Sequence, residues 1–455
     1  MPYDVIIIGS GISGLYAAYN IKKQDPNLSI LILEKHKRQW IGGRASNESF
    51  YGVEIATGAG IGRKRDKLLK KLVLELGFDV KEFKSVPHYS TLSDPIDVLH
   101  VMEFLRGQHK KYRGPPTTFE RFAKPILGAK TYRQFLESSG YTDYEKEDAY
   151  DTLYNYGMED NAGLTGFGVH WRKMVLALAA KIGEPNIKFS QNVVAISGTE
   201  GKGEDKQFAV ETEGGRKYNC KRIIVATTVT SLRSLFPDYP IYREIEGQPF
   251  LRVYGKFAKQ SIPIMKEYVR GYTCVTGPIQ KMIPMNPDEG VYMIVYNDNA
   301  NAIALKSRTE NTEENREFYC ELIEKTLGIP NGRLHLIGIR SYYWGVGTHY
   351  YKPLHIFSFK SPTSWAEMNE TSAADCAFTS CAMRNGVKTE GISGSEESGN
   401  NKLLYKDRDE FINKSQHPQN GILVVGEVVS KHQGWVEGAL ESVNAVVTKK
   451  WIENI

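Results

Sequence analysis

The chain has 455 residues, of which 41% are hydrophobic and 24% charged, enough to bury a large core and divide it between two interleaved domains. Its formal net charge of +5 is spread along the whole length, which is typical of a solvated surface and argues against a nucleic-acid partner. No apolar run reaches the roughly 20 residues that a membrane-spanning helix needs, so we expect no membrane segment.

The cysteines and the first residues indicate a reducing compartment. No CxxC pair and no neighbouring histidine cluster accompany the cysteines, so we expect neither a disulfide framework nor a metal site. The chain opens directly on the strand-like MPYDVIIIG, which is not typical of a signal peptide. These features predict a cytoplasmic protein. The cysteines are Cys220, Cys274, Cys320, Cys376 and Cys381.

A glycine-rich turn follows the first predicted strand. Residues 5–8 read as a buried parallel strand, and Gly9, Gly11 and Gly14 then form GxGxxG at the start of a helix that includes Ser13. The first glycine permits a tight turn, the second lets the backbone approach a pyrophosphate, and the third lets helix and strand pack closely. The free N–H groups of the helix N-terminus would face the anion.

An acidic residue ends the second predicted strand. Residues 29–33 form this strand, and Glu34 follows 20 residues after Gly14, where a carboxylate can bind ribose hydroxyls. A glycine turn alone is a weak signal, but strand, helix and acid together predict dinucleotide binding. An acid at this position favours an unphosphorylated ribose.

The next segment carries a resemblance to a known family. Residues 40–45, WIGGRA, resemble the second glycine motif of the flavin-containing amine oxidases, which include the monoamine and polyamine oxidases. This resemblance implies that the cofactor is FAD and that Gly42, Gly43 and Arg44 lie along it. A guanidinium near a pyrophosphate is a suitable charge-assisted donor. The preceding loop is longer than the family's, and leaves open which of its basic residues approaches the adenosine.

Residues 56–62, ATGAGIG, resemble the family segment that passes under the flavin ring. The resemblance places Ala59, Gly60 and Ile61 beside the flavin, where close backbone approach is needed. Residues 64–77 then predict an amphipathic helix. Between residues 94 and 139, helical runs alternate with Gly and Pro breaks, which predicts an inserted helical subdomain.

The middle of the chain is predicted to return to the dinucleotide domain. Residues 171–182 predict a helix, residues 187–196 one strand, and residues 218–226 another. By the resemblance, Val193 contacts the adenine; the alternative is an ordinary buried strand valine.

A mixed sheet is predicted next. Apolar alternation dominates residues 250–343, with strands at 290–295 and 334–341 around a helix at 313–327. We expect one face of this sheet to roof the flavin. Residues 390–401, EGISGSEESGNN, have the composition of a surface loop.

Two C-terminal motifs complete the resemblance. Residues 421–427, GILVVGE, and 434–442, GWVEGALES, resemble the last strand, turn and helix of the family. They imply that Gly426 and Glu427 meet the ribityl or pyrophosphate region. The Val436 N–H would face the flavin pyrimidine, where a helix N-terminus stabilises negative charge.

The predicted fold class is α/β, with a Rossmann-like FAD-binding domain interleaved with an α+β substrate domain. The FAD-binding domain is expected to comprise residues 1–84, 166–248 and 416–455. Residues 85–165 would form a helical substrate subdomain, and residues 249–415 a mixed-sheet substrate domain.

The resemblance also implies the catalytic site. Trp435 takes the position of one wall of the aromatic cage in monoamine oxidases, and His349 or its neighbour Tyr350 that of the second. Arg252 stands where the family has a lysine near flavin N5. Thr348 replaces the cysteine that links the flavin covalently, so FAD is expected to bind non-covalently.

The predicted activity is oxidation of a small-molecule amine, with hydride transfer to flavin N5 and reoxidation by O2 to give hydrogen peroxide. An aromatic amine, a polyamine and an amino acid all stay open as substrates. The subfamily stays open too, with a viral homologue among the options, as does the oligomeric state. Because this fold serves other purposes, a flavin desaturase or isomerase and a non-catalytic FAD-bound scaffold are alternatives.

Overall fold

The computed structural model describes residues 2–158, 164–198, 207–356 and 405–455. The surface loop expected at residues 390–401 lies outside these residues, as do Cys376 and Cys381. The other three cysteines are free and buried.

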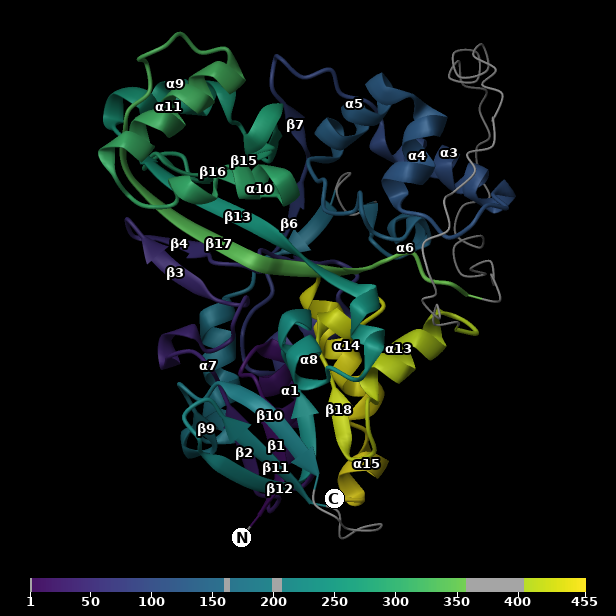
Figure 1. Cartoon of the computed structure of the whole chain (residues 1–455). Helices are drawn as coiled ribbons and strands as arrows, with labels where there is room; N and C mark the ends of the chain where they lie inside the picture. The colour runs from purple at the N-terminus through teal and green to yellow at the C-terminus, as the bar shows by residue number, and fades with distance from the viewer. Residues whose placement is uncertain (1, 159–163, 199–206, 357–404) are drawn as a thin grey trace.

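The first sheet, in the lower half of Figure 1, is parallel at its centre and covered on both faces. On its central strand, Val5 and Ile7 pack into one core while Ile6 and Ile8 pack into another, as expected of a strand buried on both sides. Among the described residues it has seven strands in the order β10-β11-β12-β1-β2-β9, with β18 beside β12. They are β1 (Tyr3–Ile8), β2 (Ile30–Leu33), β9 (Ile187–Lys188), β10 (Val193–Gly198), β11 (Phe208–Thr212), β12 (Lys217–Val225) and β18 (Ile422–Val424).

Helices cover the two faces of this sheet. Five helices contribute to the first core: α1 (Ile12–Gln24), α2 (Lys67–Glu75), α7 (Trp171–Ile182), α14 (Val436–Val446) and α15 (Lys449–Glu453). Two helices contribute to the second: α8 (Val229–Leu235) and α13 (Arg408–Gln416). The carboxyl ends of β1, β2 and β18 therefore point to one edge, which in such sheets is the usual place for a ligand.

The prediction of a single strand at residues 187–196 is wrong. The structure has two strands here, and they lie at opposite edges of the sheet, β9 beside β2 and β10 beside β11. Ser190, between them, has a φ of 56°, in the left-handed region that an extended strand cannot contain. The chain turns at this residue, where a short polar run, residues 190–192 (SQN), separates the two apolar segments.

The second sheet lies above the first and is dominated by two long antiparallel strands, β13 and β17 (Figure 1). Among the described residues its order is β17-β13-β16-β15-β14-β7. These strands are β7 (His88–Tyr89), β13 (Ile245–Phe257), β14 (Thr273–Cys274), β15 (Lys281–Asn286), β16 (Val291–Asp298) and β17 (Leu336–Tyr351). β17 extends well beyond the expected residues 334–341, because it pairs with β13 through to Tyr351.

The two faces of the second sheet differ. Leu251 and Val253 of β13 pack into a core with α9 (Ile262–Tyr268), α10 (Asn299–Ala304) and α11 (Glu313–Leu327). Arg252 and Tyr254, which alternate with them, are on the opposite face, where Tyr254 packs with residues of β3 and β4. This face is turned toward the first domain.

Four helices lie beside the second sheet and share an aromatic core: α3 (Val98–Lys111), α4 (Phe119–Leu127), α5 (Ala129–Ser139) and α6 (Ala149–Tyr154). The helix expected at residues 64–77 is shorter, α2 (Lys67–Glu75). Further short elements include the 3-10 helix η9 (Glu427–Val429) and helix α15 (Lys449–Glu453), and the strands β3 (Asn47–Phe50), β4 (Val53–Ala56), β5 (Gly62–Arg63), β6 (Glu82–Ser85) and β8 (Leu164–Phe167).

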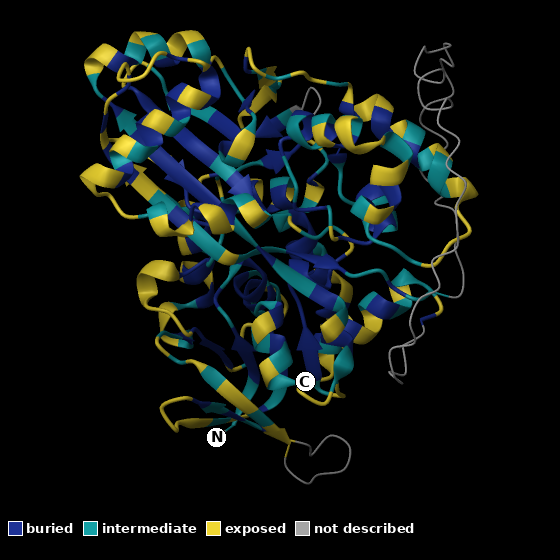
Figure 2. Ribbon diagram, turned by 45° about the horizontal axis from the view of Figure 1, so that its top comes forward, coloured by how far each residue is buried: buried dark blue, intermediate teal, exposed yellow. Residues whose placement is uncertain are grey.

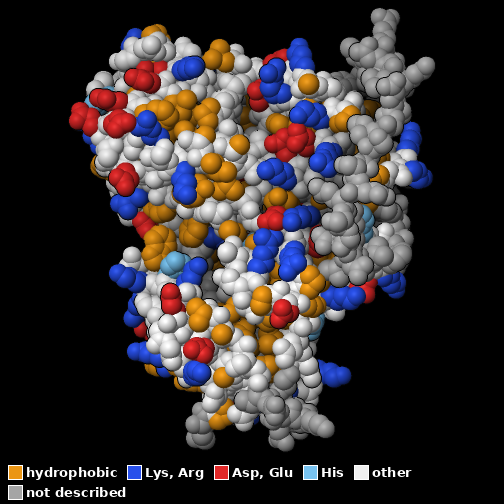
Figure 3. Space-filling model, viewed as in Figure 1, with side chains coloured by type: hydrophobic (Ala, Val, Ile, Leu, Met, Phe, Trp, Pro, Cys, Tyr) orange, Lys and Arg blue, Asp and Glu red, His pale blue; other side chains and the backbone are white. Residues whose placement is uncertain are grey.

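Burial follows these layers. Figure 2 shows the strands of both sheets mostly buried and the outer helices exposed along one side. On the face seen in Figure 3, lysine and arginine side chains are interspersed with acidic ones. None of the helices in the described residues is both long and apolar enough to cross a membrane.

Candidate functional site

The glycine turn after β1 leaves a specific space open. A Cβ on Gly9 would lie 2.4 Å from the Ala226 oxygen, and one on Gly14 would lie 2.1 Å from the Gly9 oxygen, so both glycines are required by the fold. A Cβ on Gly11 would meet no atom within 4 Å. Helix α1 begins after Gly11 without a side-chain cap and without an acidic residue in its first turn. Its first N–H groups are thus available to an anion at this place.

The second glycine pair packs against this turn. The Gly42 N–H donates to the Ser10 oxygen at 2.9 Å, and Gly11 and Gly42 form an isolated parallel bridge. A Cβ on Gly43 would lie 3.7 Å from the Gly11 Cα. On the other side, Gly426 at the end of β18 lies beside Ser13. The structure therefore brings the predicted residues Gly11, Ser13, Gly42, Gly43 and Gly426 together.

Glu34 ends β2 next to the same turn. Its carboxylate accepts hydrogen bonds from the Ser10 N–H and hydroxyl, both at 2.8 Å, and from the His36 N–H at 2.9 Å. The Gln191 N–H donates to the Glu34 carbonyl oxygen at 2.8 Å, which brings the start of β10, with the half-buried Val193, close to Glu34. This is the arrangement expected for the adenosine end of a dinucleotide site.

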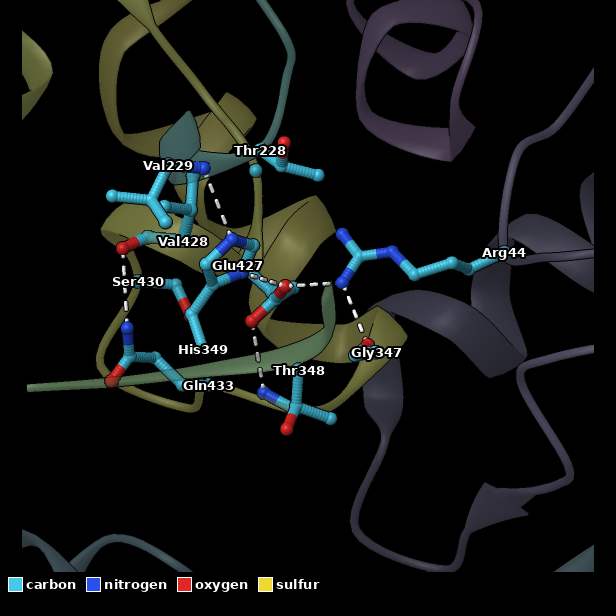
Figure 4. A network of polar contacts seen from close by, with 12 residues as sticks. Arg44, Thr228, Val229, Gly347, Thr348, His349, Glu427, Val428, Ser430 and Gln433 are labelled. Carbon is cyan, nitrogen blue, oxygen red and sulfur yellow. Dashed lines mark hydrogen bonds and ion pairs between the residues drawn. The ribbon is translucent and has the colours of Figure 1, made fainter. Parts of the chain in front are cut away.

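Arg44 and Glu427 meet in a buried network, drawn in Figure 4. The Arg44 Nη1 donates to the Glu427 carboxylate at 2.7 Å and to the Gly347 oxygen of β17 at 2.8 Å. The second carboxylate oxygen accepts from the Gly434 N–H at 3.1 Å. Burial disfavours the charged carboxylate, but the His349 ring, Arg44 and Gly434 outweigh it and hold the pKa of Glu427 well below its usual range.

His349 is part of this network and not an exposed wall. Its Nδ1 hydrogen-bonds Glu427, and its Nε2 accepts from the Val229 N–H at 3.1 Å, so the ring caps the start of α8. An Nε2 that accepts a hydrogen bond carries no proton, which leaves the ring proton on Nδ1. The His349 side chain is fully buried, and Tyr350 points to the opposite face of the strand. The expected aromatic wall at His349 or Tyr350 is therefore not what the structure forms.

The segment of residues 56–60 is held from two sides. The Tyr254 hydroxyl donates to the Ala56 oxygen at 2.6 Å, and the Trp344 Nε1 donates to the Thr57 oxygen at 2.7 Å. From the first domain, the Ala59 N–H donates to the Arg44 oxygen at 2.7 Å and the Trp171 Nε1 donates to the Gly60 oxygen at 3.3 Å. Ile61 follows and contacts β8 near Gly166. The segment is thus fixed between the two sheets.

Trp435 is stacked on a guanidinium. The Arg63 guanidinium carbon lies 3.8 Å from the Trp435 ring centre, and Arg63 in turn pairs with Asp66 at 2.7 Å. Val436 begins α14, whose N-cap residue is Trp435 and offers no side-chain hydrogen bond. The Glu437 carboxylate in the first turn accepts from the Leu68 and Leu69 N–H groups of α2 at 2.9 and 2.8 Å. The Val436 N–H is therefore available to a ligand.

Comparisons with known proteins agree with this architecture. A family model described as an NAD(P)-binding Rossmann-like domain matches residues 7–75. Coproporphyrinogen III oxidase of Staphylococcus aureus (strain NCTC 8325 / PS 47) is 35% identical over 81 residues, which cover 17% of this chain and 16% of that protein.

The whole structure is similar to solved amine oxidases. Cyclohexylamine oxidase from Brevibacterium oxydans IH-35A has a TM-score of 0.68 and 14% identity, over 99% of both chains. Putrescine oxidase with bound putrescine has a TM-score of 0.66 and 13% identity, over 98% of both chains. The chain has the amine oxidase fold. The predicted α/β class, with a Rossmann-like domain, is thereby confirmed.

Within this amine oxidase fold, the residues present fit a dinucleotide cofactor. The open space at Gly11 in front of an uncapped helix would take the pyrophosphate, with Arg44 as a cation beside it. Glu34 would take the ribose, and the uncapped start of α14 would face the other end of the cofactor. Gly42, Gly43 and Gly426 keep the backbone close on both sides.

Several contacts of this site were not predicted from the sequence. Arg63 ends β5 and Asp66 is the N-cap of α2, so no helical spacing predicts their ion pair, and nothing local relates them to Trp435. Tyr254, Trp344 and Trp171 hold the segment of residues 56–60 from three different elements. Because successive side chains of a strand point to opposite faces, Arg252 and Tyr254 are expected on the same face of β13. This alternation is the only signal for their roles in the sequence.

Proposed function

We propose that the protein is an FAD-dependent oxidoreductase that oxidises an amine. The observation that carries this proposal is the open space at Gly11, lined by the helix N-terminus, Gly43 and the nearby Arg44, in a chain with the amine oxidase fold. Bound FAD would accept hydride from the amine α-carbon, and O2 would reoxidise it with release of hydrogen peroxide.

The chain's own residues would hold the reactants. Arg44 and the α1 N-terminus would neutralise the pyrophosphate, and the N–H groups of α14 would stabilise negative charge at the pyrimidine end. The segment of residues 59–61 and the facing side of the second sheet would exclude water from the amine. Trp435, stiffened by Arg63, would form one wall.

We expect an amine to reduce the bound flavin directly. Purified protein should show a flavin absorption band near 450 nm, as oxidised flavins do, which an amine of the right class bleaches under anaerobic conditions. Oxygen should then restore the band and give hydrogen peroxide. A broad amine panel that never bleaches the band would contradict the proposal.

A desaturase or isomerase on the same fold is the second candidate, and Arg252 favours it, because a permanently charged guanidinium replaces a residue that can release a proton. If the protein were such an enzyme, only non-amine substrates would reduce the flavin, or the reaction would start only from reduced flavin. A non-catalytic FAD-bound scaffold would show a flavin spectrum, no reduction by any substrate, and a stable protein partner.

We also propose that FAD is bound without a covalent link. Thr348, at the position that the resemblance assigns to the linking residue, accepts a hydrogen bond from the Gln248 Nε2 at 3.2 Å and has no thiol. After denaturation with acid or detergent, all of the flavin should therefore pass through an ultrafiltration membrane that retains the protein. Flavin absorbance that stays with the denatured chain would contradict this. The buried free cysteines fit a reducing compartment such as the cytoplasm.

A further inference from the structure

Arg252 is a buried cation on the face of β13 that is turned toward the first domain. Only 6% of its surface is exposed, and its guanidinium carbon lies 4.5 Å from the ring centre of Tyr296. Its hydrogen-bonding neighbours are the phenol groups of Tyr254 and Tyr296 and not carboxylates. Within the described parts of the chain, no ion pair connects Arg252 to a carboxylate. A buried guanidinium normally has such a partner.

The two buried acids beside Lys281, Asp298 and Asp143, already have partners. Asp298 accepts from the Thr142 N–H at 3.1 Å and from the Gln280 Nε2 at 3.2 Å, and the positive charge next to it is that of Lys281. Asp143 accepts from the Tyr156 hydroxyl at 2.5 Å, and burial and Asp298 raise its pKa to about 7.

Lys281 is a second buried cation close to Arg252 and not a counter-charge for it. Its Nζ donates to the Gly140 oxygen at 2.5 Å and lies 4.1 Å from the ring centre of Tyr296, the ring that Arg252 also contacts. Burial lowers the pKa of Lys281 to about 7, and the positive charge of Arg252 contributes to this lowering. Lys281 therefore brings no negative charge to Arg252, and its own positive charge is disfavoured beside the guanidinium.

The guanidinium also borders the proposed flavin segment. Its Nη2 would lie 3.3 Å from a Cβ on Gly60, the central residue of the segment expected beside the flavin. Donors on the side of Arg252 that faces Gly60 are thus placed where a substrate held between the second sheet and the cofactor would pass. A planar fork of N–H donors matches a carboxylate in two parallel hydrogen bonds.

We propose that Arg252 binds a carboxylate of the substrate, so that the amine oxidised is an amino acid or another amine that carries a carboxylate. This inference rests on the proposed function. It excludes diamines and polyamines, because their second ammonium would face the Arg252 charge without water to screen it. The carboxylate would anchor the substrate at the β13 side and leave the amine end for the flavin.

The first test compares matched amines on the FAD-bound protein under anaerobic conditions. The pairs are phenylalanine with phenethylamine, leucine with isoamylamine, and lysine with cadaverine, and each pair differs only by the carboxylate. We expect at least one amino acid to bleach the flavin roughly 100-fold faster than its decarboxylated partner. Equal or faster reduction by the decarboxylated amines would overturn the inference and leave the proposed function in place.

The second test does not need turnover. Calorimetry should detect binding of 3-phenylpropionate or glutarate, but not of the corresponding amides, and Arg252→Met should weaken that binding by roughly 100-fold. Arg252→Lys, which keeps the charge, should retain part of it. Arg340→Met removes an exposed guanidinium from the adjacent strand β17 and should change nothing.

The calorimetric outcomes separate the two proposals. Carboxylate binding that Arg252→Met abolishes, in a protein that no amine reduces, would support the anion site and contradict amine oxidation. No carboxylate binding by the wild-type protein would overturn the inference. If Arg252→Met lost FAD but still bound carboxylates, the inference would also be overturned, because Arg252 would then bind the cofactor and not the substrate.

Discussion

Replacing Gly11 with alanine should weaken FAD binding by at least about 100-fold and leave the apoprotein folded. The Gly11 backbone has a φ of −66° and a ψ of 172°, which alanine adopts freely. The new methyl group would meet no protein atom within 4 Å, so it would occupy the space proposed for the pyrophosphate. Titration of the apoprotein with FAD, followed by flavin fluorescence, measures the affinity, and thermal unfolding of the apoprotein checks the fold.

Gly14→Ala is the matched control, because its methyl group would lie 2.1 Å from the Gly9 oxygen. It should destabilise the apoprotein itself, whereas Gly11→Ala should cost the apoprotein no more than about 1 kcal/mol as a weaker helix cap. FAD affinity that survives Gly11→Ala would contradict the placement of the pyrophosphate at this turn.

Glu427→Gln should reduce the unfolding free energy of the apoprotein by about 3 kcal/mol at neutral pH. The carboxylate accepts from His349, Arg44 and Gly434 at once, and a glutamine would turn an N–H group toward one of these donors. Arg44, whose side chain is 29% exposed, would also lose its counter-charge. Urea unfolding of the apoprotein measures the difference.

The same variant should change the pH dependence of stability. The pKa of Glu427 is lower in the folded protein than its ordinary value of 4.5, so the carboxylate's contribution is complete above that value. The contribution is lost as the pH falls toward the folded pKa, and Glu427→Gln should therefore show a shallower loss of stability in acid. Glu441→Gln, which removes only the partly exposed pair with His432, should behave like the wild-type protein. Equal unfolding curves for Glu427→Gln and the wild type would refute the role of this network.

Much of the fold could be predicted because its signals are local. The predicted helices at residues 171–182 and 313–327 coincide with α7 and α11, and the buried strand at residues 5–8 lies within β1. These segments have a clear period and end at a glycine or at the glycine turn. The length of β17 has no local signal, since it depends on pairing with β13, and the only local signal for the break at Ser190 is the short polar run at residues 190–192.

The candidate site divides in the same way. The glycine turns, Glu34 and Arg44 follow one another within 44 residues, and their geometry is set by one βαβ unit. The roles of His349 and Arg252 depend on contacts between residues far apart in the sequence, such as His349 with Val229. A family resemblance aligned these positions but gave no information on their contacts.

One feature of the fold bears on how the molecule responds to stress. The strand β17 touches the segment of residues 56–60 through Trp344, the Arg44 network through Gly347 and His349, and η9 through the Tyr351 hydroxyl, which donates to the Ser430 oxygen at 2.8 Å. If the packing of either sheet is lost, these contacts of β17 with the other domain are lost as well. Heating should therefore melt the two domains in a single calorimetric transition, and the space proposed for the cofactor should have little freedom to open by hinge motion.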